Sequence, residues 1–171
     1  VFIVMGVIIY MMASAGLKQA TEVGMEQRAN HYAEVIDGNI REQAALVSAL
    51  SVSWSAGMPA GADLQAAVDE LGRCNGVYGF LVGRPDGSYT TSQEMPAGYD
   101  PRTRDWYKNA ASSDGVVFSD VYKNAADGAI IVTLSKAIRG HGGELVAVIG
   151  MDASVDSMTE ILQGVKVGEH G

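Results

Sequence analysis

The chain has 171 residues, enough for one core of ordinary size, and its 47% hydrophobic content excludes an intrinsically disordered class. Its 12 Lys and Arg against 20 Asp and Glu give a net charge of −8, which is unsuited to a nucleic-acid partner. The single cysteine, Cys74, cannot form an internal disulfide, and the Cys and His residues are not clustered at metal-ligand spacing. We therefore expect a core-stabilised protein with no metal and no cofactor.

Residues 1–17 carry no charged side chain and are almost wholly apolar. As a helix they would span roughly 26 Å, close to the ~30 Å hydrocarbon core of a bilayer. One interpretation is a cleaved signal peptide, because Ala13-Ser14-Ala15 resembles a signal-peptidase site. The favoured one is the remaining outer end of a transmembrane helix, since the helical pattern continues without a break. A buried core helix fits less well, because the segment is hydrophobic all round. Both leading interpretations place the rest of the chain outside the cytoplasm.

Residues 18–56 predict one long amphipathic helix without proline. Apolar residues recur at helical spacing, as in the row formed by Leu46, Leu50 and Trp54. This length exceeds the usual globular range, so we expect a stalk, a homodimer contact or both. Residues 57–61 end the helix, and a shorter helix follows from about Asp63 to Gly72.

The periodicity then changes to short runs rich in β-branched and aromatic residues, separated by turns that contain Gly or Pro. Arg84-Pro85-Asp86-Gly87 is the clearest hairpin turn. A helical turn is expected over residues 104–111, and Asp152 or Ser154 can cap a final helix that runs to about Gln163. The expected strands cover residues 77–82, 88–92, 116–118, 129–137 and 144–151.

These elements predict an α+β fold in which the long N-terminal helix packs on a PAS-like antiparallel sheet of about five strands. The sheet and its shorter helices would form one ligand-binding module over residues 57–164.

The densest polar and aromatic stretch is Tyr99 to Tyr107, which contains Arg102, Arg104 and Trp106. Arginine offers a planar set of donors that can hold a carboxylate bidentately. Tryptophan adds an indole N–H, and tyrosine hydroxyls can donate or accept. Together they suit a pocket for a small organic anion. The alternative is that the aromatic residues only cover the sheet while both arginines pair with neighbouring acids; the residues alone leave both open.

The same stretch resembles the DPRxRxWY signature of the double-Cache (dCache) sensory domains of bacterial chemoreceptors, histidine kinases and cyclases. The resemblance continues through residues 118–122, 125–128 and 148–152. It implies a membrane-distal, extracytoplasmic ligand-binding module of an inner-membrane receptor, facing the periplasm. Residues 165–171 are similar to the start of the membrane-proximal module of such proteins.

The amino-acid-binding subset of that family is similar in a more specific pattern of six positions within these stretches. The resemblance implies that one group of residues holds the ligand carboxylate and a second group holds its ammonium. Asp120 is expected to add a further polar contact, and Arg102 to have a structural role. The implied carboxylate group is Tyr99, Arg104 and Trp106, and the implied ammonium group is Tyr107, Tyr122 and Asp152.

Two of these residues have plainer interpretations. An Asp before a helix is often only a cap, so Asp152 could serve that role. Tyr122 could be a cross-strand packing residue. Both alternatives stay open from the sequence.

We therefore expect the sensor of a methyl-accepting chemotaxis protein that binds a free L-amino acid. The alternative is the same fold sensing an amine or a small carboxylate in a histidine kinase or diguanylate cyclase. Arg104 and Asp152 together disfavour both ligands, because each would leave one charge unpaired. No enzymatic activity is expected, since the sequence offers no nucleophile–base set or metal site.

Overall fold

The computed structural model describes residue 34 and residues 37–154. The predicted membrane segment at 1–17, the first half of the long helix, the final helix and residues 165–171 lie outside this part. Within it, no helix combines the length and the apolar character that a membrane span requires. The second half of the long helix is present and covers residues 37–56, ending where the sequence predicts.

The remaining elements follow the predicted order along the chain. After the long helix come a second helix, a hairpin, two short helices or helical turns, and four further strands. They are α2 (Gly61–Leu71), β1 (Gly79–Gly83), β2 (Tyr89–Thr91), η1 (Pro101–Thr103), α3 (Asp105–Ala111), β3 (Val117–Phe118), β4 (Tyr122–Lys123), β5 (Ile130–Arg139) and β6 (Leu145–Ser154).

The strands form one antiparallel sheet in the order β2-β1-β6-β5-β3, with β4 also paired to β5. This confirms the predicted α+β arrangement, but the sheet has six strands instead of five. The missed strand, β4, pairs Tyr122 with Ile131 and Lys123 with Ile130. β4 has two residues, one of them charged, so it lacks the apolar run that marks β3, and its pairing with β5 identifies it.

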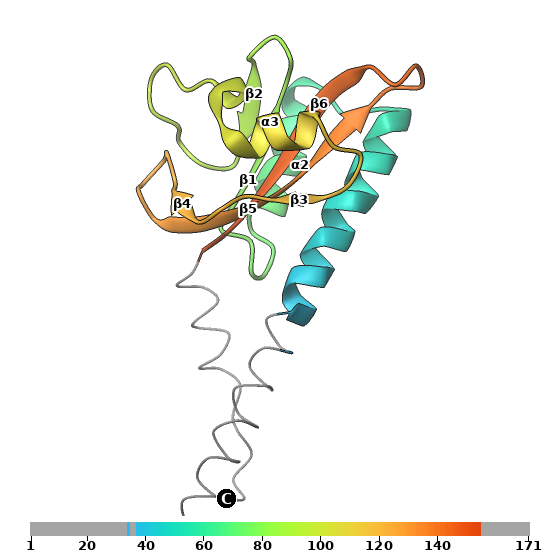
Figure 1. Ribbon diagram of the computed structural model, residues 1–171. Helices are drawn as coiled ribbons and strands as arrows, with labels where there is room; N and C mark the ends of the chain where they lie inside the picture. The colour runs from blue at the N-terminus through green and yellow to red at the C-terminus, as the bar shows by residue number, and fades with distance from the viewer. Residues whose placement is uncertain (1–33, 35–36, 155–171) are drawn as a thin grey trace, which may run out of the picture.

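Helices cover both faces of the sheet (Figure 1). The helix at 37–56 and α2 lie on one face, and α3 lies on the other. Alternating residues of β1 explain this arrangement, because successive side chains of a strand point to opposite faces. Phe80 and Val82 belong to the core under the first two helices, whereas Leu81 packs with α3.

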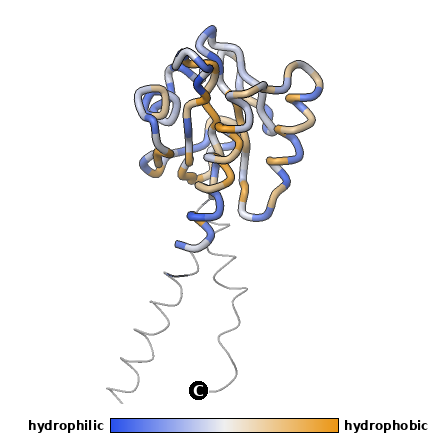
Figure 2. The backbone as a smooth tube through the Cα atoms, turned by 90° about the vertical axis from the view of Figure 1, so that its right-hand side faces the viewer, coloured by the Kyte–Doolittle hydropathy of each residue, from blue (hydrophilic) through white to orange (hydrophobic). Residues whose placement is uncertain are grey.

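Figure 2 shows hydrophobic residues gathered along the central strands, with hydrophilic segments at the periphery. Phe80 is fully buried there, and its ring meets the ring of Trp54 edge-on at a centroid distance of 6.5 Å. This contact joins the long helix to the middle of the sheet.

Replacing Phe80 with alanine is expected to lower the free energy of unfolding by about 3–5 kcal/mol, because it leaves a cavity in the core. Phe118→Ala is the matched control, since the Phe118 side chain is 50% exposed, and its expected cost is below about 1 kcal/mol. Urea denaturation followed by circular dichroism measures both. Equal losses would contradict this placement of the core.

Gly150 lets α3 approach the sheet closely. A Cβ atom at this position would lie 3.0 Å from Leu81 Cδ2 and 3.2 Å from Trp106 Cε3. The absent side chain therefore gives the indole of Trp106 its place against β6, which positions the start of α3 over one end of the sheet.

Candidate functional site

A pocket of about 440 Å³ opens beside the start of α3 and the segment that joins β3 to β4. This volume suits a ligand of the size of a small metabolite. Four of the seven residues predicted for the site line it. The lining residues are Thr103, Arg104, Asp105, Trp106, Asn109, Ser119, Asp120 and Tyr122.

Arg104 immediately precedes α3, and its backbone is extended, with φ −86° and ψ 144°. Its guanidinium carbon lies 5.5 Å from the centre of the Tyr122 ring, which restrains the charge by a cation–π interaction. Within the part of the chain that the structure describes, Arg104 makes no ion pair with a carboxylate. Its donors therefore remain for a ligand.

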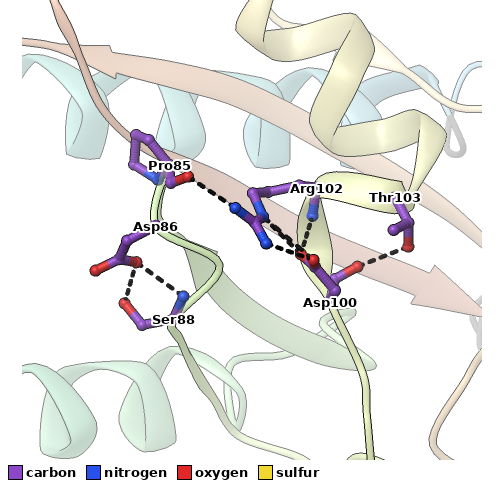
Figure 3. A network of polar contacts seen from close by, with 6 residues as sticks. All are labelled: Pro85, Asp86, Ser88, Asp100, Arg102 and Thr103. Carbon is purple, nitrogen blue, oxygen red and sulfur yellow. Dashed lines mark hydrogen bonds and ion pairs between the residues drawn. The ribbon is translucent and has the colours of Figure 1, made fainter.

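Arg102 does not line this pocket, and its side chain instead contacts Asp100 and Pro85 (Figure 3). Its Nε lies 3.0 Å from Asp100 Oδ1, its Nη2 lies 2.8 Å from Asp100 Oδ2, and its Nη1 donates to the Pro85 carbonyl oxygen at 3.3 Å. Asp100 Oδ1 also accepts from the Arg102 N–H. The suggestion that both arginines pair with neighbouring acids is thus correct for Arg102 only, and Asp105 pairs with Lys108.

Tyr99 reaches the same region from the loop before η1. Its ring meets the Tyr89 ring edge-on at 5.1 Å, and its hydroxyl is hydrogen-bonded to the Trp106 side chain. Burial raises the pKa of Tyr99 to about 12, so the hydroxyl stays protonated at neutral pH. Because the indole N–H can only donate, the Tyr99 oxygen accepts from it and keeps its own proton for another partner.

Asp152 lies in β6, between Gly79 of β1 and Thr133 of β5 in the sheet register. The side chain is buried, with the residue 2% exposed, and Oδ1 accepts a hydrogen bond of 2.6 Å from the Thr133 hydroxyl. Burial raises the pKa of Asp152 to about 6, although the Thr133 bond and the charge of Arg104 oppose this. The predicted last strand was too short: β6 continues to Ser154, and Asp152 lies inside it, so the capping interpretation is not supported.

Tyr122 connects the pocket to this buried carboxyl. Its hydroxyl oxygen lies 2.6 Å from the Thr133 hydroxyl oxygen, and burial strongly raises the pKa of Tyr122. The hydroxyls of Tyr122 and Thr133 and the carboxyl of Asp152 therefore form one continuous hydrogen-bonded chain. Sequence reasoning missed Thr133; the available signal was a hydroxyl-bearing residue among the apolar residues of the strand predicted at 129–137.

Three predicted site residues, Tyr99, Asp152 and Tyr107, do not line the pocket. Of these, Tyr107 lies in the hydrophobic cluster beside α3. It packs with Leu81 and Val148, beside Gly83, and its hydroxyl has no hydrogen-bond partner among the described residues. The charges that act on its pKa are those of Arg102 and neighbouring acids, not those of Arg104 and Asp152. Successive residues of a helix point about 100° apart, and of this pair only Trp106 lines the pocket.

The pocket wall therefore contains the guanidinium of Arg104 and the side chain of Tyr122, and the buried carboxyl of Asp152 lies behind Tyr122, linked to it through Thr133. In the described residues, no group of His, Cys, Asp and Glu side chains could hold a metal ion. Asp120 lines the pocket and is exposed.

Comparison with known proteins finds relatives among bacterial methyl-accepting chemotaxis proteins. Among curated proteins, the chain is 33% identical over 99 residues to the methyl-accepting chemotaxis protein McpB of Bacillus subtilis, covering 56% of this chain and 14% of McpB. It is 28% identical over 153 residues to the methyl-accepting chemotaxis protein McpA of Pseudomonas putida, covering 80% of this chain and 24% of McpA. The chain thus spans a quarter or less of the length of these relatives.

Solved structures share the fold. The ligand-binding domain of the Pseudomonas aeruginosa amino acid chemoreceptor PctC in complex with GABA matches with a TM-score of 0.73 and 26% identity, covering 83% of this chain and 67% of that one. The ligand-binding domain of the Pseudomonas fluorescens chemoreceptor CtaA in complex with L-valine matches with a TM-score of 0.67 and 25% identity, covering 76% and 59%.

A family described as "Methyl-accepting chemotaxis protein-like, first PDC sensor domain" matches residues 65–160, more than half of the chain. This match includes η1, α3 and all six strands of the sheet, and so contains the pocket. The chain belongs to this family of chemoreceptor-type sensor domains.

Proposed function

We propose that this chain is the ligand-binding sensor of a methyl-accepting chemotaxis receptor and binds a free L-amino acid. The observation that carries the proposal is one cation, Arg104, in the pocket wall, with one buried carboxyl, Asp152, behind Tyr122 and joined to it through Thr133. A zwitterion needs fixed charges of both signs a few ångströms apart, and isolated buried charges are otherwise costly.

The carboxylate of the ligand would bind at the Arg104 end. The guanidinium can hold both carboxylate oxygens, as arginine commonly does. Tyr99, whose oxygen accepts from Trp106, would donate its own proton to the same carboxylate. Trp106 thus acts chiefly by orienting Tyr99.

The ammonium of the ligand would bind at the Tyr122 end. The ionised carboxylate of Asp152 supplies the opposite charge, and the oxygen of Tyr122 supplies a nearer acceptor in the pocket wall. Tyr107 is left out of this group because it lies on another side of α3. Asp120, exposed on the pocket wall, would contact the ligand's side chain.

The similar proteins support this class of ligand. PctC was solved with GABA and CtaA with L-valine, and both ligands carry an ammonium and a carboxylate. An amine or a simple carboxylate would satisfy only one end of the pocket and leave the other charge without a partner.

The sensor would be anchored in the bacterial inner membrane by residues 1–17, with the module at 57–164 in the periplasm. The helix at 18–56 would serve as stalk and homodimer contact, and residues 165–171 would begin a membrane-proximal module. We propose that the module has no catalytic activity and responds to its ligand through a change in the position of this helix.

Thermal-shift titration of the purified chain against the twenty L-amino acids tests the proposed function. Micromolar affinity corresponds to about −8 kcal/mol. At a hundred times Kd, a bound amino acid would raise Tm by about 5–10 °C. If none of the twenty raises Tm at millimolar concentration, the proposed function is wrong.

A further inference from the structure

Thr133 lies between the two residues assigned to the ammonium. It is fully buried in β5, directly opposite Asp152 in the register of the sheet. Its hydroxyl oxygen lies 2.6 Å from Asp152 Oδ1 and 2.6 Å from the Tyr122 hydroxyl oxygen. Both distances belong to strong O–H···O hydrogen bonds. The Thr133 N–H donates to Ser119 Oγ at 2.9 Å, which holds this strand position against the pocket wall.

Counting the available hydrogens shows which group donates in each of these two hydrogen bonds. A threonine hydroxyl has one hydrogen, and an ionised carboxylate only accepts. Thr133 therefore gives its hydrogen to Asp152, and the hydrogen between Thr133 and Tyr122 must come from Tyr122. The phenolic proton then points away from the pocket, and the remaining lone pairs of the Tyr122 oxygen are left for a ligand.

We propose that Thr133 is a specificity-determining positioning residue, which makes the Tyr122 hydroxyl an acceptor toward the pocket so that the site selects an ammonium group. The inference rests on the proposed function, because it concerns the ammonium end of the same ligand. It adds a residue that does not line the pocket and acts through Tyr122.

The sharpest contrast is between an amino acid and the 2-oxo acid with the same side chain. Both carry the carboxylate that Arg104 would hold. The oxo oxygen, however, can only accept, so it would meet the acceptors of Tyr122 and Asp152 with no hydrogen between them. Without the Thr133 hydroxyl, the phenolic proton could turn into the pocket and donate to the oxo oxygen, and the discrimination would fall.

The test uses calorimetry at pH 7.5 on the purified full chain. The probes are the amino acid that binds the wild-type chain most tightly among the twenty and its 2-oxo acid. Thr133→Val is expected to lower the ratio of the two affinities at least tenfold. Thr133→Ser, which keeps the hydroxyl, should stay within about threefold of the wild type.

Ser135→Ala is the matched control. Ser135 is buried two residues further along β5, and its hydroxyl donates to the Trp106 carbonyl oxygen at 3.0 Å. The variant loses a buried hydroxyl from the same strand, so any general loosening of the sheet would appear in it too. Its affinity ratio is expected to stay within about threefold of the wild type.

Tyr122→Phe gives a second route if Thr133→Val does not fold. It removes the acceptor itself while Thr133 remains, so it should also lower the affinity ratio at least tenfold. The proposal is overturned if the ratio is unchanged in Thr133→Val or Tyr122→Phe, or if Ser135→Ala or Thr133→Ser lowers it equally. A wild-type chain that binds none of the twenty amino acids would instead refute the proposed function beneath it.

Discussion

Replacing Arg104 with alanine is expected to weaken amino-acid binding by at least a hundredfold. The variant removes the cation that holds the ligand carboxylate, and truncating one partner of a desolvated charge pair costs about 2–5 kcal/mol. About 3 kcal/mol corresponds to more than a hundredfold in Kd. Calorimetry with the tightest-binding amino acid measures this loss. Arg104→Lys should retain part of the affinity, because it keeps the charge and loses the bidentate geometry.

Arg102→Ala is the matched control for this loss of a positive charge. Arg102 is two residues away, but its guanidinium is occupied by Asp100 and the Pro85 carbonyl oxygen (Figure 3). Because the control removes the same charge outside the pocket, Kd should change by less than about threefold. Equal losses in Arg102→Ala and Arg104→Ala would mean that general electrostatic attraction, and not a specific contact, explains binding.

Amino-acid affinity is expected to fall as the pH drops below about 6. Burial holds the pKa of Asp152 at about 6, and only the ionised carboxylate can pair with the ligand ammonium. Below that pH, Kd should rise about tenfold per pH unit, and above about pH 7 it should be constant. Calorimetry between pH 4.5 and 8 checks this profile.

The stability of the ligand-free chain should change in the opposite sense. The folded state holds the Asp152 proton more tightly than the unfolded state, where the carboxyl titrates near 3.8. The contribution of this group to the free energy of unfolding is therefore fully present below about pH 4 and is lost as the pH rises to about 6. Asp152→Asn, which stays neutral, should make the ligand-free chain more stable at pH 7.5 by up to about 3 kcal/mol, while abolishing amino-acid binding.

Asp114→Asn provides the control for the change in charge. Its carboxyl is almost fully exposed beside Arg139, so neither the affinity nor its pH profile should move. If Asp152→Asn destabilises the ligand-free chain at pH 7.5, or binds the amino acid as the wild type does, the role assigned to the buried carboxyl is wrong.

The elements of this fold were largely predictable from the sequence because their periodicity is local. Helix 37–56 ends where the apolar rows end, and β5 and β6 are rich in apolar and β-branched residues between turns that contain Gly. The short strand β4 was not predictable in this way. Its two residues are extended only because β5 lies alongside to pair with them.

At the site, too, the contacts that depend on tertiary structure could not be predicted from local sequence patterns. The residues alone did not distinguish Arg102 from Arg104, and only the family resemblance implied different roles. The structure separates them at the turn η1, where Arg102 pairs with Asp100 and Arg104 lines the pocket. Thr133 reaches Asp152 only through the register of β5 on β6, which no sequence motif records. Tyr107 matches the family pattern in sequence, yet its place on α3 turns it away from the pocket.

The central claim is that the pocket recognises both charges of an amino acid at once. The most direct test is calorimetric titration of the full chain with three matched compounds: the tightest-binding amino acid, the amine that lacks its carboxylate, and the acid that lacks its ammonium. We predict that only the amino acid binds with micromolar affinity and that each partial analogue binds at least a hundredfold more weakly. An amine or an acid that binds as tightly as the amino acid would contradict the account.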